Sequence, residues 1–220
     1  MHEKAISQSV EMYLVTIYRL TEHDKKASTH DIAGLLGVSL PSVTGQLKRL
    51  TEKGYVDYAW REGASLTESG RLIALGVLRK NRLIKTFLYR QAGYGLDELF
   101  DEACVIEHVV SDRFADALEK MLDHPERDPH GLPIPDDRGN VPPTMGTRLE
   151  AIAPPCEFET VRLNEVSQRA VAYCGEIGLT PPQTAHYRNR DEEHFHIVVN
   201  GNEIYVPRAI AEHVLVKVTS

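Results

Sequence analysis

Apolar residues in the first quarter of the chain recur at the spacing of helices. One helical face is formed by positions i, i+3, i+4 and i+7, namely Val10, Tyr13, Leu14 and Ile17. A second helix is expected to start at Ser28, a good N-cap residue, and to end at Gly37. A third is expected from Ser39, with Pro41 in its first turn, to Gly54. Two helices joined by a Gly-Val-Ser turn are typical of a helix-turn-helix.

The pattern then changes to that of a hairpin. Residues 56–66 alternate between apolar and polar side chains around a charged tip at residues 61–63. This stretch predicts the β-wing of a winged helix-turn-helix. A long helix is expected to follow, from about Arg71 to Arg90.

The middle of the chain predicts more helix and then a long loop. A helical segment is expected from Leu96 to Leu122, with a break near Ser111. Residues 124–147 hold so many prolines, glycines and aspartates that no regular element can continue through them. They predict an ordered loop or linker.

Beyond about residue 156 the pattern is that of strands. Phe195, Ile197 and Val199 alternate with polar residues, and Asn200-Gly201 is a strong signal for a type I′ turn. The last residues of the chain alternate in the same way, which indicates a barrel-like domain. The predicted fold class is therefore mainly α with a small all-β C-terminal domain.

Composition narrows the class of protein. No apolar run approaches the roughly 20 residues that span a bilayer, and no signal peptide is evident, so we expect a cytoplasmic protein without a membrane partner. The net charge of −7 argues against a surface covered with basic residues that would bind nucleic acid without sequence preference. Three scattered cysteines (Cys104, Cys156 and Cys174) exclude a disulfide framework and are expected to be free thiols.

The third helix carries the polar groups expected of a DNA-reading element. Short polar side chains, a proline and a lysine lie along its first turns, with an arginine on the wing; the candidate DNA-binding residues are Ser39, Pro41, Ser42, Thr44, Gln46, Lys48 and Arg61. Winged helices also serve as protein-interaction modules, but the caps, the turn and the charged wing together favour double-stranded DNA.

A possible metal site lies beyond residue 100. Cys104, Glu107 and His108 share one helical face at i, i+3 and i+4, and thiol, carboxylate and imidazole together suit a first-row divalent transition metal. Met12 points away from the apolar face of the first helix and is a candidate fourth ligand. The opposite face of the later helix is apolar and is expected to pack inward: Leu99, Ile106 and Val109.

Other interpretations stay open on spacing alone. Cys104 could be a small core residue, and Glu107 with His108 could be a solvated face. An enzyme is disfavoured, because no nucleophile motif, phosphate loop or His-Glu-x-x-His helix is present. A thiol-redox sensor based on Cys104 and a metal-independent winged-helix regulator are the alternatives to a metal-dependent repressor.

Several of these segments together resemble the diphtheria toxin repressor family of iron- and manganese-responsive regulators. The resemblance rests on Glu11 to Leu14, the helix-turn-helix, Asp101 to Cys104 with Glu107-His108, and His130-Gly131 with Pro133 to Pro135. It implies a homodimer that binds palindromic operators when loaded with metal and controls metal-uptake genes. It also implies that Met12, Cys104, Glu107 and His108 form the activating metal site.

The resemblance also implies a domain organisation. It gives a winged helix-turn-helix over 1–75, a helical dimerisation and metal-binding domain over 76–146, a linker over 147–155, and an SH3-like domain over 156–220, similar to ferrous-transport accessory proteins. The metal would join the first of these domains to the second and so fix the spacing of the two recognition helices. Fe²⁺ is the first choice because thiolate and thioether are softer ligands, with Mn²⁺ a close alternative.

One departure from the family concerns its second, ancillary metal site. The positions that match its ligands are Asn81, Lys85 and Phe100, of which the last two cannot bind a metal in their usual states. We expect that site to be absent in its usual form. Our hypothesis is that the Lys85 ammonium replaces the missing cation by neutralising nearby carboxylates. Four other histidines could form a different second site but are expected at the surface or in loops: His124, His130, His194 and His196.

Overall fold

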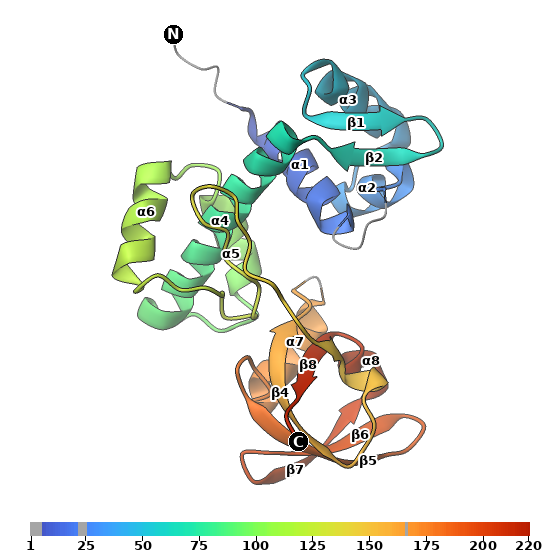
Figure 1. The fold of residues 1–220 in the computed structure, drawn as a ribbon, viewed down its shortest axis with the longest axis vertical. Helices are drawn as coiled ribbons and strands as arrows, with labels where there is room; N and C mark the ends of the chain where they lie inside the picture. Colours follow the sequence, from blue (N-terminus) through green and yellow to red (C-terminus); the bar gives the residue numbers. More distant parts are fainter. Residues whose placement is uncertain (1–5, 22–25, 166) are drawn as a thin grey trace. The chain divides into compact units, whose positions relative to one another are not determined.

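The computed structural model describes residues 6–21, 26–165 and 167–220 and divides them into two compact units. Unit 1 holds the residues up to Arg79 together with Pro135–Asn140, and unit 2 holds Lys80–Ile134 and Val141–Ser220 (Figure 1). This division falls inside a long helix. The predicted boundaries at residues 76, 147 and 156 remain predictions.

Unit 1 is a winged helix-turn-helix, as the sequence predicts. Its elements are α1 (Gln8–Thr21), α2 (Thr29–Leu36), α3 (Leu40–Glu52), β1 (Val56–Ala59), β2 (Gly63–Leu66) and the first part of α4 (Glu68–Gln91). The strands β1 and β2 pair antiparallel, from Val56 opposite Leu66 to Ala59 opposite Gly63, and form the wing (Figure 1).

The predicted caps of α2 and α3 are confirmed. The Ser28 hydroxyl accepts a hydrogen bond from the Asp31 N–H at 3.0 Å, and Ser39 accepts one from the Ser42 N–H at 3.4 Å. Gly37 ends α2 in the left-handed region at φ 64°. These local bonds fix where each helix of the helix-turn-helix starts and stops.

The helix α4 starts three residues earlier than predicted. The Thr67 hydroxyl accepts a hydrogen bond from the Gly70 N–H at 3.2 Å, and this cap lets the helix begin at Glu68 instead of Arg71. The same hydroxyl donates to the Gly54 carbonyl at 2.7 Å, so the helix start is tied to the turn after α3.

Unit 2 begins with helices and continues into an ordered loop. The helices α5 (Leu99–Ile106) and α6 (Asp112–Met121) confirm the predicted break, which Ser111 makes by capping α6. Residues 122–146 contain neither helix nor strand, in agreement with their proline content. A short strand, β3 (Thr147–Arg148), follows.

The C-terminal part is a six-stranded antiparallel sheet in the order β3-β8-β4-β5-β6-β7. The remaining strands are β4 (Cys156–Leu163), β5 (Thr184–Arg190), β6 (His194–Val199), β7 (Asn202–Pro207) and β8 (Val214–Val218). Asn200 and Gly201 join β6 to β7 with φ angles of 51° and 78°, as a type I′ turn requires. The predicted sheet domain is therefore confirmed.

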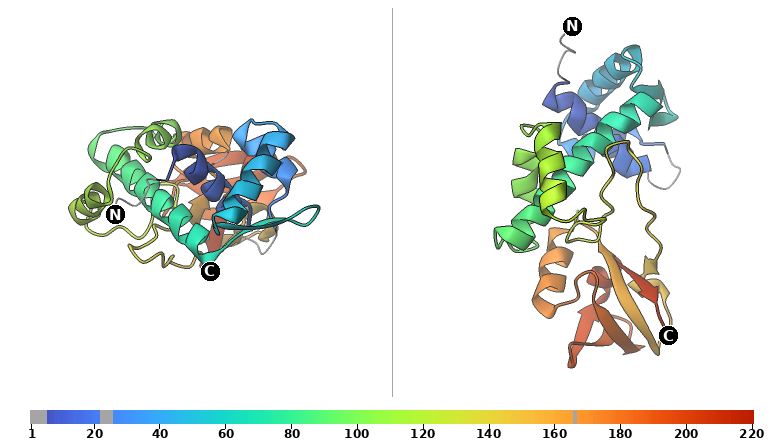
Figure 2. Two further views of the ribbon diagram at one scale, coloured as in Figure 1. Left: turned by 90° about the horizontal axis from the view of Figure 1, so that it is seen from above. Right: turned by 60° about the vertical axis from the view of Figure 1, so that its left-hand side comes forward.

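Besides a short 3₁₀ helix, η1 (Leu149–Ala151), two α-helices among the described residues of this part were not predicted. They are α7 (Gln168–Ile177), seen beside the sheet in Figure 2, and the short α8 (Arg208–Ala211). The description of the domain as all-β therefore leaves out part of its structure. Val171 and Cys174 of α7 are buried in the same hydrophobic cluster as Leu83 and Leu99 of the helical part, so unit 2 has one continuous core.

Candidate DNA-reading and metal-binding sites

The helix α3 has one buried face and one polar face. Val43, Leu47 and Leu50 are fully buried in unit 1. On the other side, Ser39, Pro41, Ser42 and Lys48 are exposed, while Thr44 and Gln46 are half-buried. The hydroxyl of Thr44 donates to the Leu40 carbonyl at 3.0 Å, within the helix. Of the six predicted DNA-reading residues at the start of α3 and along it, four are therefore accessible and two are partly covered.

The wing tip carries a residue that the sequence analysis missed. Trp60 is 69% exposed, and the Arg61 guanidinium lies 4.1 Å from the centre of its ring. Beside them Glu62 accepts a hydrogen bond from Lys26 at 2.9 Å, and this bond lowers the pKa of the Glu62 carboxyl. An exposed tryptophan next to an arginine in a charged hairpin tip is a signal that the sequence alone could have given.

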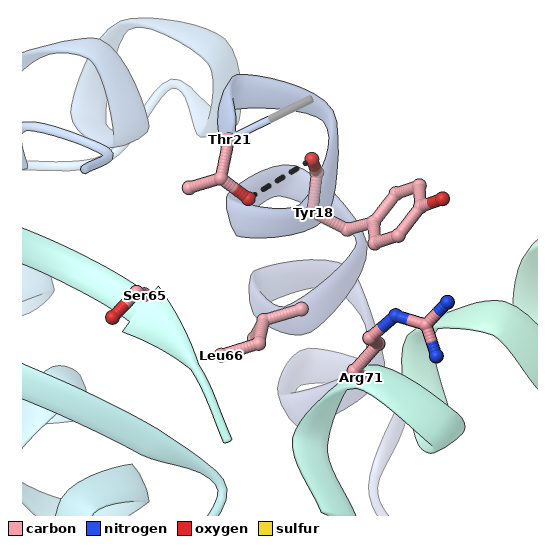
Figure 3. A pocket seen from close by; sticks show the side chains of 5 residues that line it. All are labelled: Tyr18, Thr21, Ser65, Leu66 and Arg71. Carbon is pink, nitrogen blue, oxygen red and sulfur yellow. Dashed lines mark hydrogen bonds between the residues drawn. The ribbon is translucent and has the colours of Figure 1, made fainter. Parts of the chain in front are cut away.

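Unit 1 also contains a cavity of about 300 Å³. Figure 3 shows the side chains that line it: Tyr18, Thr21, Ser65, Leu66 and Arg71. Among the described residues, hydroxyl groups, the Leu66 side chain and a guanidinium line it.

The three predicted ligands beyond residue 100 lie at the end of α5. Cys104 is half-buried in the last turn, and Glu107 is the C-cap residue with helical backbone angles. His108 follows in the turn, with its Nε2 3.2 Å from a Glu107 carboxylate oxygen. Both of these side chains are about nine-tenths buried. The structure therefore brings imidazole and carboxylate together directly after the thiol-bearing turn.

The predicted packing face of this helix is only partly correct. Leu99 is fully buried and Ile106 packs against the core, but Val109 is 82% exposed. The reason is that α5 ends at Ile106, and the turn that follows takes Val109 out of the helical register. Met12, in unit 1, is 43% exposed, whereas the α1 face formed by Val10, Tyr13, Leu14 and Ile17 is buried, as predicted.

Burial disfavours the thiolate form of the other two cysteines. Cys174 is fully buried, and burial raises the pKa of its thiol to about 12. Burial also raises the pKa of Cys156. Because the thiolate is the form that binds metal, this burial makes both thiols less suited to a metal than an unburied thiol would be.

Lys85 pairs with a carboxylate, as our hypothesis requires. Its ammonium donates to a carboxylate oxygen of Glu165, and the lysine side chain is fully buried. The ring of Phe100 faces the same ammonium at 5.3 Å. The neighbouring position, Asn81, is 1% exposed. A lysine cation thus lies at a position where the resemblance implies a metal ligand.

A buried cluster beside this pair was not predicted as a site. One ligand atom each of Asp128, His130 and Glu165 lies within 4.8 Å of the other two, and all three residues are buried. His130 lies in the long loop, which agrees with the expectation of a surface or loop residue, but its side chain is fully buried.

Comparison with known protein families adds an independent result. The family model for the iron dependent repressor N-terminal DNA binding domain matches residues 5–64. The model for the iron dependent repressor metal binding and dimerisation domain matches residues 67–136. The chain belongs to the iron-dependent repressor family. Members of this family are metal-dependent transcriptional repressors and not enzymes, as the sequence predicts.

Individual relatives agree with this family. The diphtheria toxin repressor of Corynebacterium diphtheriae is 35% identical over 172 residues, covering 75% of this chain and 76% of the relative. The iron-dependent repressor IdeR of Mycobacterium tuberculosis is 38% identical over 127 residues, 58% of this chain and 55% of that one. A manganese-dependent transcriptional repressor solved in complex with manganese superposes with a TM-score of 0.87, at 31% identity, over 96% of this chain and all of its own.

Proposed function

We propose that this repressor binds a palindromic operator as a homodimer when Met12, Cys104, Glu107 and His108 hold a divalent transition metal, and that it controls metal-uptake genes. The observation that carries the proposal is the buried contact between His108 and Glu107, one turn after Cys104. These residues lie in the segment that matches the metal binding and dimerisation model. The buried imidazole and carboxylate, together with the thiol of Cys104, supply the nitrogen, oxygen and sulfur donors of a mixed metal site.

Met12 would give the metal its control over DNA binding. It lies in unit 1, which carries the DNA-reading helix, and the other three ligands lie in unit 2. A ligand that binds two elements at once changes the equilibrium between their arrangements, whereas an ion that touches only one of them has no such effect. Metal and operator are then expected to increase each other's affinity.

Exposed apolar side chains support the homodimer. Four of them lie on α5, on α6 and in the turn between these helices, with exposed fractions of 48–82%: Val105, Val109, Phe114 and Met121. Apolar side chains grouped on one part of a surface indicate an interface. We therefore assign this surface to the contact between two copies of the chain.

We propose Fe²⁺ as the metal, which the donors and some of the relatives support. A thioether and a thiolate favour Fe²⁺ over Mn²⁺, and the IdeR relatives are named iron-dependent. The structural relative named manganese-dependent keeps Mn²⁺ as the close alternative. With no long apolar helix among the described residues that could cross a bilayer, we also propose that it acts in the cytoplasm.

The test is operator binding at controlled metal concentration. Purified protein is titrated onto its promoter fragment under anaerobic conditions with chelator, with Fe²⁺ and with Mn²⁺. We expect binding only with metal. Equal operator binding with chelator and with metal would overturn the proposal in favour of a metal-independent regulator. Operator binding in the presence of chelator that is lost when peroxide is added would indicate a thiol sensor.

Met12→Ala is expected to weaken metal-dependent operator binding by roughly 5- to 150-fold, the usual range of coupling between two sites. The fold should be preserved, because Met12 is 43% exposed. The measurement is operator affinity at saturating and limiting Fe²⁺. The control is Met145→Ala, which removes a thioether that is 77% exposed in the loop. Equal affinities for the two variants would contradict a role of Met12 as a ligand.

Two substitutions on α3 should separate base contacts from phosphate contacts. Gln46→Ala is expected to weaken binding by about 1–3 kcal/mol and to relax the preference at one base position. Lys48→Ala should weaken binding to all sequences alike and reduce the slope of log affinity against log salt concentration by about one. The measurement is binding to a set of operator variants at several salt concentrations. The same salt dependence for Lys48→Ala and the wild type would exclude a phosphate contact.

A further inference from the structure

The loop that joins β1 to β2 is the wing tip, formed by Trp60, Arg61 and Glu62. Trp60 is the only tryptophan in the chain, and it is 69% exposed. The Arg61 guanidinium lies 4.1 Å from the centre of its ring. The backbone of Arg61 has φ 70°, in the left-handed region that residues other than glycine seldom adopt. Strained backbone of this kind is concentrated at sites that bind ligands. The wing tip therefore has the features of a contact surface.

Hydrogen bonds hold the wing tip in one position. The Ala27 N–H donates to the Ala64 carbonyl and the Ala64 N–H donates to the Ala27 carbonyl, each at 2.8 Å. The Glu62 N–H donates to the Ala59 carbonyl at 3.1 Å and closes the loop. A Cβ added to Gly63 would lie 2.7 Å from the Ala27 carbonyl oxygen, so the hairpin is in close contact with the segment before α2. A partner thus meets a wing tip that is already ordered, which reduces the entropy lost on binding.

The wing directly follows the DNA-reading helix. The helix α3 ends at Glu52 and β1 begins at Val56, and both belong to unit 1 (Figure 1). Between them the Tyr55 N–H donates to the Leu50 carbonyl at 3.0 Å. Some proteins that place a helix in a major groove reach into the adjacent minor groove with a neighbouring segment. The wing tip is the segment of unit 1 suited to this second contact.

The side chains of the wing tip present hydrogen-bond donors. An indole N–H and a guanidinium can only donate. Within the described part of the chain, the Trp60 N–H makes no hydrogen bond and Arg61 pairs with no carboxylate. The carboxylate of Glu62 is occupied by the Lys26 ammonium at 2.9 Å. Asp57, the carboxylate of β1, lies further from the tip. The accessible polar groups of Trp60 and Arg61 are therefore all donors.

Donors of this kind match one type of DNA surface. In the minor groove an A·T pair presents only acceptors, whereas a G·C pair adds the N2 amino group of guanine, which is a donor. A narrow A·T-rich minor groove also attracts arginine. We propose that Trp60 and Arg61 bind an A·T-rich minor groove beside the base pairs that α3 contacts. This rests on the operator binding proposed above, and it makes Trp60 a residue that determines sequence preference.

The first test changes the minor groove while keeping the hydrogen-bonding groups of the major groove. Inosine pairs with cytosine and differs from guanosine only in lacking the N2 amino group. Full-length protein at saturating Fe²⁺ is titrated onto operators that carry A·T, G·C or I·C pairs beside the positions contacted by α3. We expect the A·T and I·C operators to bind alike and the G·C operator to bind roughly 5- to 150-fold more weakly, the usual effect of one unfavourable base pair. Equal affinities for G·C and I·C would overturn the proposal.

Variants assign this preference to the wing tip. Trp60→Ala is expected to bind all three operators alike, and Trp60→Phe, which keeps a ring beside Arg61 but removes the N–H, should keep part of the preference. Because Trp60 is 69% exposed, both variants should melt at the wild-type temperature. The control is Tyr205→Ala, which removes a ring that is 58% exposed in unit 2 and should keep the full preference. A Trp60→Ala protein with the wild-type preference would exclude a role of this ring.

The second test uses the fluorescence of the single tryptophan. Quenching of Trp60 by acrylamide is measured for the Mn²⁺-loaded protein with and without operator. We expect the operator to protect Trp60 and metal alone to leave it accessible. Protection by metal without DNA would place the ring in a protein contact and would overturn the proposal, as would full quenching at saturating operator. Failure of the proposed function would look different: the operator would bind equally with chelator and with metal, while the preference among the three operators stayed.

Discussion

Lys85→Met is expected to lower the free energy of unfolding by about 3–5 kcal/mol, the usual cost of removing one partner of a buried ion pair. The Lys85 side chain is fully buried, and the carboxylate that it contacts is 7% exposed. Methionine fills a similar volume but leaves the Glu165 carboxylate buried without its ammonium. The measurement is chemical denaturation of the metal-free protein.

The same helix offers a matched control. Lys80 makes an ion pair with Asp112 at 2.8 Å, but that carboxylate is 89% exposed, so Lys80→Met should cost only about 0–1 kcal/mol. The double variant Lys85→Met with Glu165→Gln removes both charges and should recover most of the lost stability. A Lys85→Met variant as stable as Lys80→Met would show that the buried pair contributes nothing.

The parts of the fold that sequence predicts well are those fixed by neighbours along the chain. Ser28, Gly37 and Ser39 act through bonds to residues within four positions, so their types alone give both limits of α2 and the start of α3. The Asn200-Gly201 turn is equally local. The helix α7 could have been found by the same reasoning, because Ser167 caps its start and Gly178 ends it at φ 73°.

The candidate sites divide in the same way. Glu107 and His108 are neighbours in the chain and lie in contact, whereas a shared site with Cys104 follows from helical spacing alone and stays a prediction. The contact of Lys85 with Glu165 joins residues 80 positions apart, and only the packed core decides it. The burial of His130 could not be predicted from the sequence. The prolines around it identify a loop, but a loop has no hydrophobic periodicity that would show which of its side chains are buried.

Gly70→Ala is expected to destabilise unit 1 by about 3 kcal/mol or more, beyond the common range for an added core methyl group. Gly70 lies in the first turn of α4, where a Cβ would be 2.0 Å from the Tyr55 carbonyl oxygen. That oxygen also accepts a hydrogen bond from the Thr67 N–H at 3.1 Å. The start of α4 would have to move away from the turn that follows α3, breaking this bond. The measurement is thermal unfolding together with operator affinity.

Gly76→Ala is the control that separates this contact from a general effect of alanine. Gly76 lies in the same helix, and a Cβ there would meet nothing within 4 Å. Alanine has the higher helix propensity, so this variant should gain up to about 1 kcal/mol. Changes in stability of opposite sign for the two variants would show that the effect of Gly70→Ala comes from the contact with Tyr55. Since α4 continues from unit 1 into unit 2, Gly70→Ala should also weaken the coupling of metal to operator. Unchanged coupling in a folded Gly70→Ala protein would mean that α4 does not transmit the signal between metal and DNA.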